Sequence, residues 1–251
     1  MIPTEIVNHI LGLLHSDEEY TTLKICLVVF PELVERYLYS RISFTEPPAH
    51  LSPTFTFNKK QNYVVDPTKL SLALIDRPHV AKYVRSVHIF MDNYHSLLVT
   101  SSILPKLPQI ESIALIGNQR HFSWNMLDPA FHTIFQNSVR LPSIEAVAIS
   151  GIGLFPLDIL NDCRNLRHLL LFTQCASGEG VSAPHLRSLG IQNQEDLIMA
   201  KMITSIKSNT LHSLSLRPND RTKFTQIRDL IEACSASLVN LELNHRFYGA
   251  L

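Results

Sequence analysis

The chain of 251 residues has few cysteines, no net charge and no long apolar run, and each of these shortages excludes a class of protein. Its four cysteines, at positions 26, 163, 175 and 234, are too few and too scattered for a disulfide framework, and no Asn-x-Ser/Thr sequon occurs. Lysine and arginine total 22, as do aspartate and glutamate, so charge gives no argument for a nucleic-acid partner or an anionic membrane. No apolar run approaches the roughly 20 residues that span a bilayer, and the start of the chain lacks the features of a signal peptide. We therefore expect a soluble protein of the cytoplasm or nucleus, with no nucleic-acid or membrane partner.

Patterns that would indicate catalysis or metal binding are also missing. The 12 histidines include no pair at the helical spacing of zinc hydrolases, and the cysteines form no C-x-x-C pair. The segment 151–153 (Gly-Ile-Gly) lacks the third glycine of a dinucleotide-binding loop, and the segment 177–180 lacks the Lys-Ser/Thr of a phosphate-binding loop. We expect no enzyme, no cofactor and no metal site.

The chain is rich in apolar residues, which make up 45% of it, and many of them recur at regular intervals. At its start, Ile2, Ile6, Ile10 and Leu14 recur every four residues, which predicts a helix from about Pro3 to Leu14 with one apolar face. We expect this segment to be the first helix of a compact helical module.

Two further helices are predicted by their start signals. Ser16 and Glu19 have the spacing of a capping box, so a second helix should begin at about residue 17. Pro31 then marks a break and the first turn of a third helix that runs to about Tyr39. The first 44 residues are thus predicted to be a three-helix module.

Within this module, an ordered set of residues resembles the F-box, in the form common among basidiomycete fungi. The residues that carry the resemblance are Ile2-Pro3, Glu5-Ile6, Ile10-Leu11 and Leu14. The match covers roughly residues 1–44, and it departs from the family near the third helix, where a Trp is often found and this chain has Phe30 and Leu33. The resemblance implies that these helices bind a Skp-type adaptor of a cullin-RING ubiquitin ligase. The adaptor-binding residues would be Ile2, Pro3, Glu5, Ile6, Ile10, Leu11 and Leu14.

After a proline-containing linker predicted over residues 45–65, a hexad of the form apolar-x-x-apolar-x-apolar recurs. Its copies are Val84–Ile89, Ile110–Leu115, Ile144–Ile149, Leu166–Leu171, Leu186–Ile191, Leu211–Leu216 and Leu238–Leu243. Bare matches arise by chance in a chain so rich in Leu, Ile and Val, so the intervals of about 20 to 34 residues are the stronger evidence, because they match the leucine-rich-repeat period. We expect each copy to be a short strand.

Helices are predicted between the strands. Asp66-Pro67 and Asp128-Pro129 each have an N-cap followed by proline at the first helical position. The first of these helices should turn Leu70, Leu74 and Ile75 inward. Further helices are expected over residues 156–163, 195–207 and 225–233, and the interval of 34 residues between Ile110 and Ile144 should hold an extra helix and the lone Trp124. Strand and helix in alternation predict an α/β solenoid over residues 66–251, with parallel strands on one face and helices on the other.

The repeats should be irregular. A regular leucine-rich repeat has an asparagine eight positions after the first hexad residue, and only Asn118 and Asn219 fall there; Asp92 is a possible substitute, and Ile152 is not.

If the hexad's apolar positions face inward, its third and fifth positions and the residue after it face outward along the sheet. Most of these residues are small, which suggests a shallow groove with anchors at Phe90, Leu170 and Phe172 and with polar ends. The alternative is that loops or the linker cover the larger side chains. The candidate substrate-binding residues are Phe90, His168, Leu170, Phe172, Gln192, Arg217 and Asn244. The histidines at hexad positions, such as His88, are expected to face the surface.

Two functions agree with these patterns. The first is a substrate-recognition subunit of an SCF-type ubiquitin ligase, with the F-box on the adaptor and the repeats on an unknown protein substrate. The second is a repeat scaffold without a ligase role, whose N-terminal helices cap the solenoid and bury the apolar face of the first helix against the first repeat.

Overall fold

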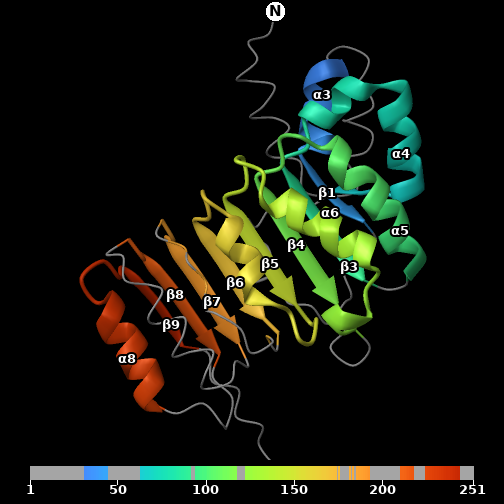
Figure 1. Cartoon of the computed structure of the whole chain (residues 1–251). Coiled ribbons are helices and arrows are strands. Elements are labelled where there is room, and N and C mark those ends of the chain that lie inside the picture. Colours follow the sequence, from blue (N-terminus) through green and yellow to red (C-terminus); the bar gives the residue numbers. More distant parts are fainter. Residues whose placement is uncertain are drawn as a thin grey trace, which may run out of the picture.

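Within the described residues, nine short parallel strands form the centre of the molecule. The computed structural model describes residues 31–44, 63–91, 94–117, 122–173, 175, 181, 183, 185–192, 210–217 and 224–243. The strands form one sheet in the order β2-β1-β3-β4-β5-β6-β7-β8-β9, and every neighbouring pair is parallel. They are β1 (Arg41–Phe44), β2 (Tyr63–Val64), β3 (Ser86–Met91), β4 (Ser112–Gly117), β5 (Ala146–Ser150), β6 (His168–Phe172), β7 (Ser188–Gln192), β8 (Ser213–Arg217) and β9 (Asn240–Leu243). From β3 onward the strands lie side by side in chain order (Figure 1).

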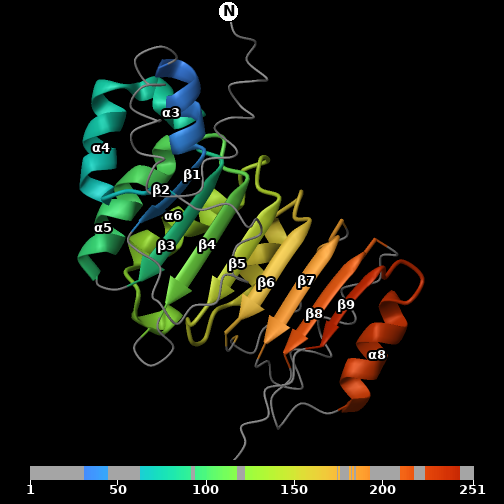
Figure 2. The same ribbon diagram turned by 180° about the vertical axis from the view of Figure 1, so that it is seen from behind.

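The helices cover one face of this sheet. They are the α-helices α3 (Pro31–Tyr39), α4 (Pro67–Asp76), α5 (Tyr94–Ile103), α6 (Pro129–Val139) and α8 (Phe224–Cys234), and the 3₁₀ helices η2 (Pro78–Lys82), η3 (Leu104–Lys106), η4 (Trp124–Met126) and η5 (Leu157–Asp162). Seen from behind, the strands lie in front of α6, and none of the described helices lies on that side (Figure 2). We call this side of the sheet the open face. The molecule is therefore an α/β protein with a solenoid-like arrangement, as the sequence predicts.

A recurring backbone contact joins each unit to the next. The carbonyl of the second hexad residue accepts hydrogen bonds from two successive backbone N–H groups of the following hexad. Arg85 O, for example, accepts from Glu111 N at 2.7 Å and from Ser112 N at 3.0 Å, and Arg187 O accepts from His212 N and Ser213 N at 2.8 and 3.0 Å. The same pair of bonds recurs from β1 to β9, so the hexads are structural repeats and not chance matches.

The core lies between the sheet and its helices, and it is made by the apolar positions of the hexads. Val84, Val87 and Ile89 of the first copy are buried, and the corresponding residues of the next five copies are buried as well. Each of these six copies adds three apolar side chains to one continuous cluster, which neither a strand nor a helix of this length could bury alone.

Side chains just before the hexads tie neighbouring repeats together. Ser143 Oγ, Thr210 Oγ1 and Ser237 Oγ each donate a hydrogen bond to the carbonyl of the preceding repeat's first hexad residue, at 2.6, 3.0 and 2.8 Å. Asn165 Nδ2 donates to the carbonyl of Pro142 at 2.7 Å. In a regular leucine-rich repeat, an asparagine eight positions after the first hexad residue makes a tie of this kind, and Asn118 and Asn219, which hold that position here, lie outside the described residues. At Ile152, Thr173 supplies the tie, since its hydroxyl bonds both the N–H and the carbonyl of Ile152.

The predicted helix starts are confirmed. Asp66 caps α4 by accepting from Thr68 N at 2.7 Å and Lys69 N at 3.2 Å, and Asp128 caps α6 by accepting from Ala130 N at 2.7 Å. Helix α8 matches the prediction over 225–233 within a residue, and α3 has the predicted bounds.

Other helix predictions need correction. Ile75 does not face inward but is 66% exposed, because on α4 the buried stripe follows the four-residue spacing of Leu70 and Leu74. The helix expected over 156–163 is the 3₁₀ helix η5. The helices expected before residue 31 and over 195–207 lie outside the described residues.

The interval between Ile110 and Ile144 contains α6 and the short helix η4. Trp124 opens η4 and is 5% exposed, and its ring stacks on His132 at a centroid distance of 4.4 Å and meets Phe155 edge-on at 5.0 Å. The carbonyl of Trp124 is 2.8 Å from His132 Nε2, which ties η4 to α6. The extra helix is thus a single turn anchored by the lone tryptophan.

Two strands were missed by the sequence analysis. In β1 the register pairs Ile42 with Val87 and Phe44 with Ile89, so the segment 39–44 is an eighth hexad whose first residue is Tyr39. A hexad made only of Leu, Ile and Val does not match it, because Tyr39 and Phe44 hold the first and last apolar positions. The sheet therefore begins within the range predicted for the helical module, and β2 lies in the range predicted for the linker. No helix within the described part of the chain is long and apolar enough to cross a membrane.

Candidate functional site: the open face of the sheet

Three rows of residues lie across the open face, in the register that the parallel pairing sets. The first row begins at Ser86, the second at His88 and the third at Phe90. Across the sheet the second row continues through Ala114, Ala148, Leu170, Gly190, Ser215 and Glu242, and the third through Ile116, Ser150, Phe172, Gln192 and Arg217. The sequence assigned these positions to one face, and the register confirms the assignment.

On β3 to β5, the apolar side chains of the open face are buried. Phe90, Ala114, Ile116 and Ala148 form a second apolar cluster, separate from the main core, and Leu170 packs against it. Phe90 and Phe172 are each 4% exposed. The prediction that both phenylalanines are exposed anchors of a shallow groove is therefore wrong. The alternative reading of the sequence, in which the larger side chains are covered, agrees with their burial.

Leu170 is accommodated by the glycine beside it. Gly190 is its partner on β7, and a Cβ added to Gly190 would lie 2.4 Å from Leu170 Cδ2 and 3.7 Å from the Phe172 ring. The missing side chain lets Leu170 and Phe172 lean across the neighbouring strand. Leu170 stays half-buried, so it is the one predicted apolar anchor that solvent reaches.

The face over β6 to β9 is open and polar. The Arg217 guanidinium lies 5.6 Å from the centroid of the Phe172 ring, a distance at which a cation is attracted to an aromatic face. Ser215 Oγ donates to Glu242 Oε2 at 2.9 Å. Asn240 and Glu242 on the last strand are exposed, while His168, Ser213 and Arg217 are half-buried. The accessible part of the predicted site thus combines Leu170 with polar and charged groups from β6, β8 and β9.

The two histidines of this face sit in different surroundings. Burial, with a smaller contribution from the Arg41 charge, lowers the pKa of His88 from 6.5 to about 4, so its ring is neutral near pH 7. The expectation that His88 faces the surface is wrong, because the side chain is 4% exposed. Burial also lowers the pKa of the half-buried His168, against the opposing charge of Glu145 and together with those of Arg167 and Arg187.

Helix α3 is fastened to the first repeat by polar contacts that the sequence did not reveal. Glu35 pairs with Arg77 and, at 3.1 Å, with His79 Nε2, and its side chain is only 12% exposed. The hydroxyl of Tyr83 donates to Glu32 Oε1 at 3.2 Å. The partners are 42 to 51 residues apart in the chain, a separation at which no sequence spacing links them.

The remaining predicted site residues lie outside the described part of the structure. These are the adaptor-binding residues Ile2, Pro3, Glu5, Ile6, Ile10, Leu11 and Leu14, together with the side chain of Gln192 and all of Asn244. Among the described residues, no three His, Cys, Asp or Glu side chains gather as a metal site. Cys163 is buried, its thiol donates to the carbonyl of Val139 at 3.0 Å, and burial raises its pKa to about 12, which suits a structural thiol and not a nucleophile.

These arrangements describe a rigid surface with polar, charged and apolar groups held in register, which can bind another molecule along the strands. In the comparisons with known proteins, no family model, no curated protein and no solved structure matches the chain.

Proposed function

We propose that this protein is a substrate-recognition subunit of an SCF-type cullin-RING ubiquitin ligase. Its F-box-like N-terminus would bind the Skp-type adaptor, and the open face of β6 to β9 would hold a protein substrate. The protein itself carries out no chemistry in this proposal. It links a target to the transfer machinery.

The substrate half of the proposal rests on one observation, the half-open face of a continuous parallel sheet. Leu170, Arg217 and Glu242 lie on β6, β8 and β9 in fixed register. A sheet whose other face is packed into a single core holds these groups in place, so little order is lost when a partner binds. An apolar centre with a polar rim is the usual composition of a protein interface.

The adaptor half rests on the residues that resemble the F-box and on the position of α3. The helix occupies Pro31–Tyr39, the range predicted for the third helix of the module, and leads directly into β1. An F-box at this place would be joined to the repeats without a flexible spacer. Such a junction would fix the direction in which a bound substrate is presented.

A second candidate function is a repeat scaffold with an N-terminal cap. The ion pairs of Glu35 with Arg77 and His79 favour it, since they show that α3 packs against the first repeat as a cap would. In this case the apolar positions of the first helix would also pack on the repeat and would be closed to an adaptor.

Co-purification with a fungal Skp-type adaptor separates the two functions. We expect the wild-type chain to retain the adaptor and the Ile6→Asp, Ile10→Asp double variant to lose it, because truncating or charging a central interface anchor costs about 2 kcal/mol or more. The matched control is Leu72→Asp, Ile75→Asp, which places the same two charges on an exposed face of α4, where Leu72 and Ile75 are 58% and 66% exposed.

Both double variants must show the cooperative unfolding of the wild type, measured by circular dichroism. Adaptor retained equally by the wild type and by the folded helix-one variant would contradict the ligase proposal. An adaptor that never binds the wild-type chain would favour the scaffold.

A further inference from the structure

The strand β9 is an exposed apolar edge of the sheet. It lies at one end of the strand order (Figure 2), and no described strand pairs with its outer side. Leu241 and Leu243 are 45% and 53% exposed, whereas their partners on β8 are at most 2% exposed. Val239, just before the strand, is 74% exposed. Three of the eight large apolar side chains that are exposed in the described part of the chain thus lie within residues 239–243, which we call the edge strand.

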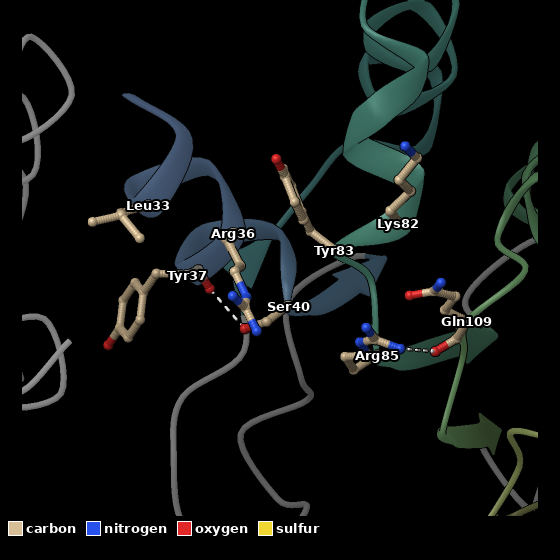
Figure 3. Close-up of a pocket in the computed structure, with 8 residues that line it drawn as sticks. All are labelled: Leu33, Arg36, Tyr37, Ser40, Lys82, Tyr83, Arg85 and Gln109. Carbon is tan, nitrogen blue, oxygen red and sulfur yellow. Dashed lines mark hydrogen bonds between the residues drawn. The ribbon is translucent and has the colours of Figure 1, made fainter. Parts of the chain in front are cut away.

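Val239 holds a position that is polar in the earlier units. In the six hexads from Val84 onward that precede it, the second residue is charged or a histidine: Arg85, Glu111, Glu145, Arg167, Arg187 and His212. Arg85, for example, lies 3.3 Å from Glu111 Oε1 and donates to the carbonyl of Gln109 at 3.3 Å (Figure 3). The earlier units therefore use this position for polar contacts between neighbouring strands. An exposed valine in the same place favours a surface that another chain covers.

Within the described residues, the backbone of the edge strand has no partner on its outer side. His212 O accepts from Val239 N and Asn240 N, both at 2.9 Å, so these two N–H groups point toward β8. Because successive N–H groups of a strand point to opposite sides, Leu241 and Leu243 direct theirs away from β8. In the earlier units the carbonyl of the second hexad residue accepts hydrogen bonds from the next unit, and no described strand follows Val239 to donate them. Such an edge is a template for a further strand.

The sequence of the edge strand is symmetric about Leu241, and this symmetry selects a second copy of the chain as its partner. The strand reads apolar, polar, leucine, polar, apolar (Val-Asn-Leu-Glu-Leu). In an antiparallel pair with a twofold axis at Leu241, Leu241 faces itself, Val239 faces Leu243, and Asn240 faces Glu242. Apolar side chains then meet apolar ones, and the Asn240 amide can donate to the Glu242 carboxylate. An axis at Glu242 would instead place two like charges opposite each other.

We propose that the chain forms a homodimer in which the edge strands of two copies pair antiparallel. In this register, Leu241 N–H donates to the Leu241 carbonyl of the second copy, and Leu243 N–H donates to the carbonyl of Val239. A head-to-tail contact between β9 and β2 would be shorter, because β2 has only two residues. The twofold axis is perpendicular to the sheet, so the open faces of both copies lie on the same side and meet at β9. The proposal goes beyond the ligase role and does not depend on it.

Sedimentation velocity of the full chain over a dilution series tests the proposal. We expect a dimer that dissociates on dilution, because an interface made by so short an edge is small. Leu241→Lys places two like charges opposite each other on the axis and should weaken dimerisation about tenfold or more. Leu98→Lys makes the same change on α5, at a leucine that is 59% exposed, and should leave dimerisation unchanged.

Both replaced leucines are exposed, so the variants should fold, and unfolding midpoints equal to that of the wild type would verify it. A chain that stays monomeric at every concentration would overturn the proposal, and the edge would then be free for a strand of a different protein. A dimer that both variants weaken equally, or that neither weakens, would also overturn it.

Disulfide crosslinking locates the axis. Facing residues of an antiparallel pair have Cα atoms about 4.5 to 5.5 Å apart, which a disulfide can bridge. The parent chain carries Cys26→Ser, and its remaining cysteines are buried: Cys163, Cys175 and Cys234. We expect Leu241→Cys alone to crosslink two copies. Leu243→Cys alone should not, because its two copies would be about 14 Å apart along the strands, but Leu243→Cys mixed with Val239→Cys should. Crosslinking by Leu243→Cys alone as efficient as by Leu241→Cys would overturn this register.

Discussion

Single small residues decide how closely neighbouring segments of this solenoid approach. A Cβ on Gly117 would lie 2.8 Å from the carbonyl oxygen of Gly151, which is backbone and cannot rotate away. A Cβ on Gly153 would meet nothing nearer than 3.7 Å. Gly151 itself adopts a left-handed φ of 63°, a conformation that glycine reaches without steric cost.

We predict that Gly117→Ala lowers the free energy of unfolding by about 1 to 3 kcal/mol, the usual cost of overpacking. Gly153→Ala is the matched control and should change it by less than about 0.5 kcal/mol. Urea denaturation of both variants measures the difference. Equal effects of the two substitutions would show that the contact with Gly151 does not limit the approach.

Burial of His88 makes the stability depend on pH. The folded chain holds the pKa of this ring at about 4, below its ordinary value of 6.5, so the unfolded chain binds the proton first as the pH falls. The stability is full above pH 6.5 and decreases toward pH 4. At about 1.4 kcal/mol for each pH unit, about 2 kcal/mol is lost between pH 6.5 and pH 5.

We predict that His88→Gln removes most of this loss, as measured by urea denaturation at several pH values between 5 and 7. Part of the dependence should persist, because burial lowers the pKa of His168 in the same direction. A variant that retains the full wild-type slope would mean that His88 is not the group that titrates.

Sequence patterning predicts on which face of the sheet a side chain lies, but it does not predict whether that side chain is buried. The alternation of side chains placed Phe90 and Phe172 on the correct face, since that depends only on the two-residue period of a strand. It could not predict that both are 4% exposed, because the burial of a sheet face depends on whatever packs over it and not on the strand itself. The contact of Arg217 with the Phe172 ring likewise depends on register between strands 45 residues apart in the chain.

Among the helices and strands, the first residue of a helix was easier to predict than the side chains that face the core. Asp66 and Asp128 each precede a proline, and both accept the backbone hydrogen bonds that an N-cap requires. The strand β1 does not follow the Leu, Ile and Val pattern of the other hexads, since the aromatic residues Tyr39 and Phe44 hold its first and last apolar positions and pack in the core. A hexad search that accepts aromatic residues would have found it.

We predict that Asp128→Ala lowers the free energy of unfolding by about 1 kcal/mol, because the N–H of Ala130 loses its acceptor at the start of α6. Asp128→Asn keeps an acceptor oxygen and should change the stability by a few tenths of a kcal/mol. Thermal unfolding of the two variants provides the comparison. A loss of similar size in both would assign the effect to charge and not to the cap.

The packing of α3 against the first repeat can be tested by substituting one side chain. Glu35→Gln removes the charge that faces Arg77 and His79, and we predict about fivefold faster amide exchange in residues 31–39, which corresponds to about 1 kcal/mol. Glu232→Gln, in an exposed pair with Arg228, should leave exchange in that segment unchanged. Exchange in 31–39 that does not respond to Glu35→Gln would show that these pairs do not hold the helix.

At the scale of the whole molecule, one core runs through all the units from β1 to α8, and the repeated double hydrogen bond to the second hexad residue joins each unit to its neighbour. The α/β class, the parallel sheet and the covered and open faces could be predicted from hexad spacing, because each follows from strand and helix in alternation. The last strand that the structure describes is less packed, since Leu241 and Leu243 on β9 are 45% and 53% exposed. A bound partner would lie on the open face over β6 to β9, between this strand and the buried apolar cluster over β3 to β5.

The most direct test of the two-part receptor is hydrogen exchange of the full chain with and without a saturating concentration of Skp-type adaptor, followed by mass spectrometry. We predict slower exchange in peptides that cover residues 1–14, with no change in 212–217 and 240–243, because the open face is kept for a different partner. Slower exchange confined to the sheet, or no change anywhere in the chain, would contradict it.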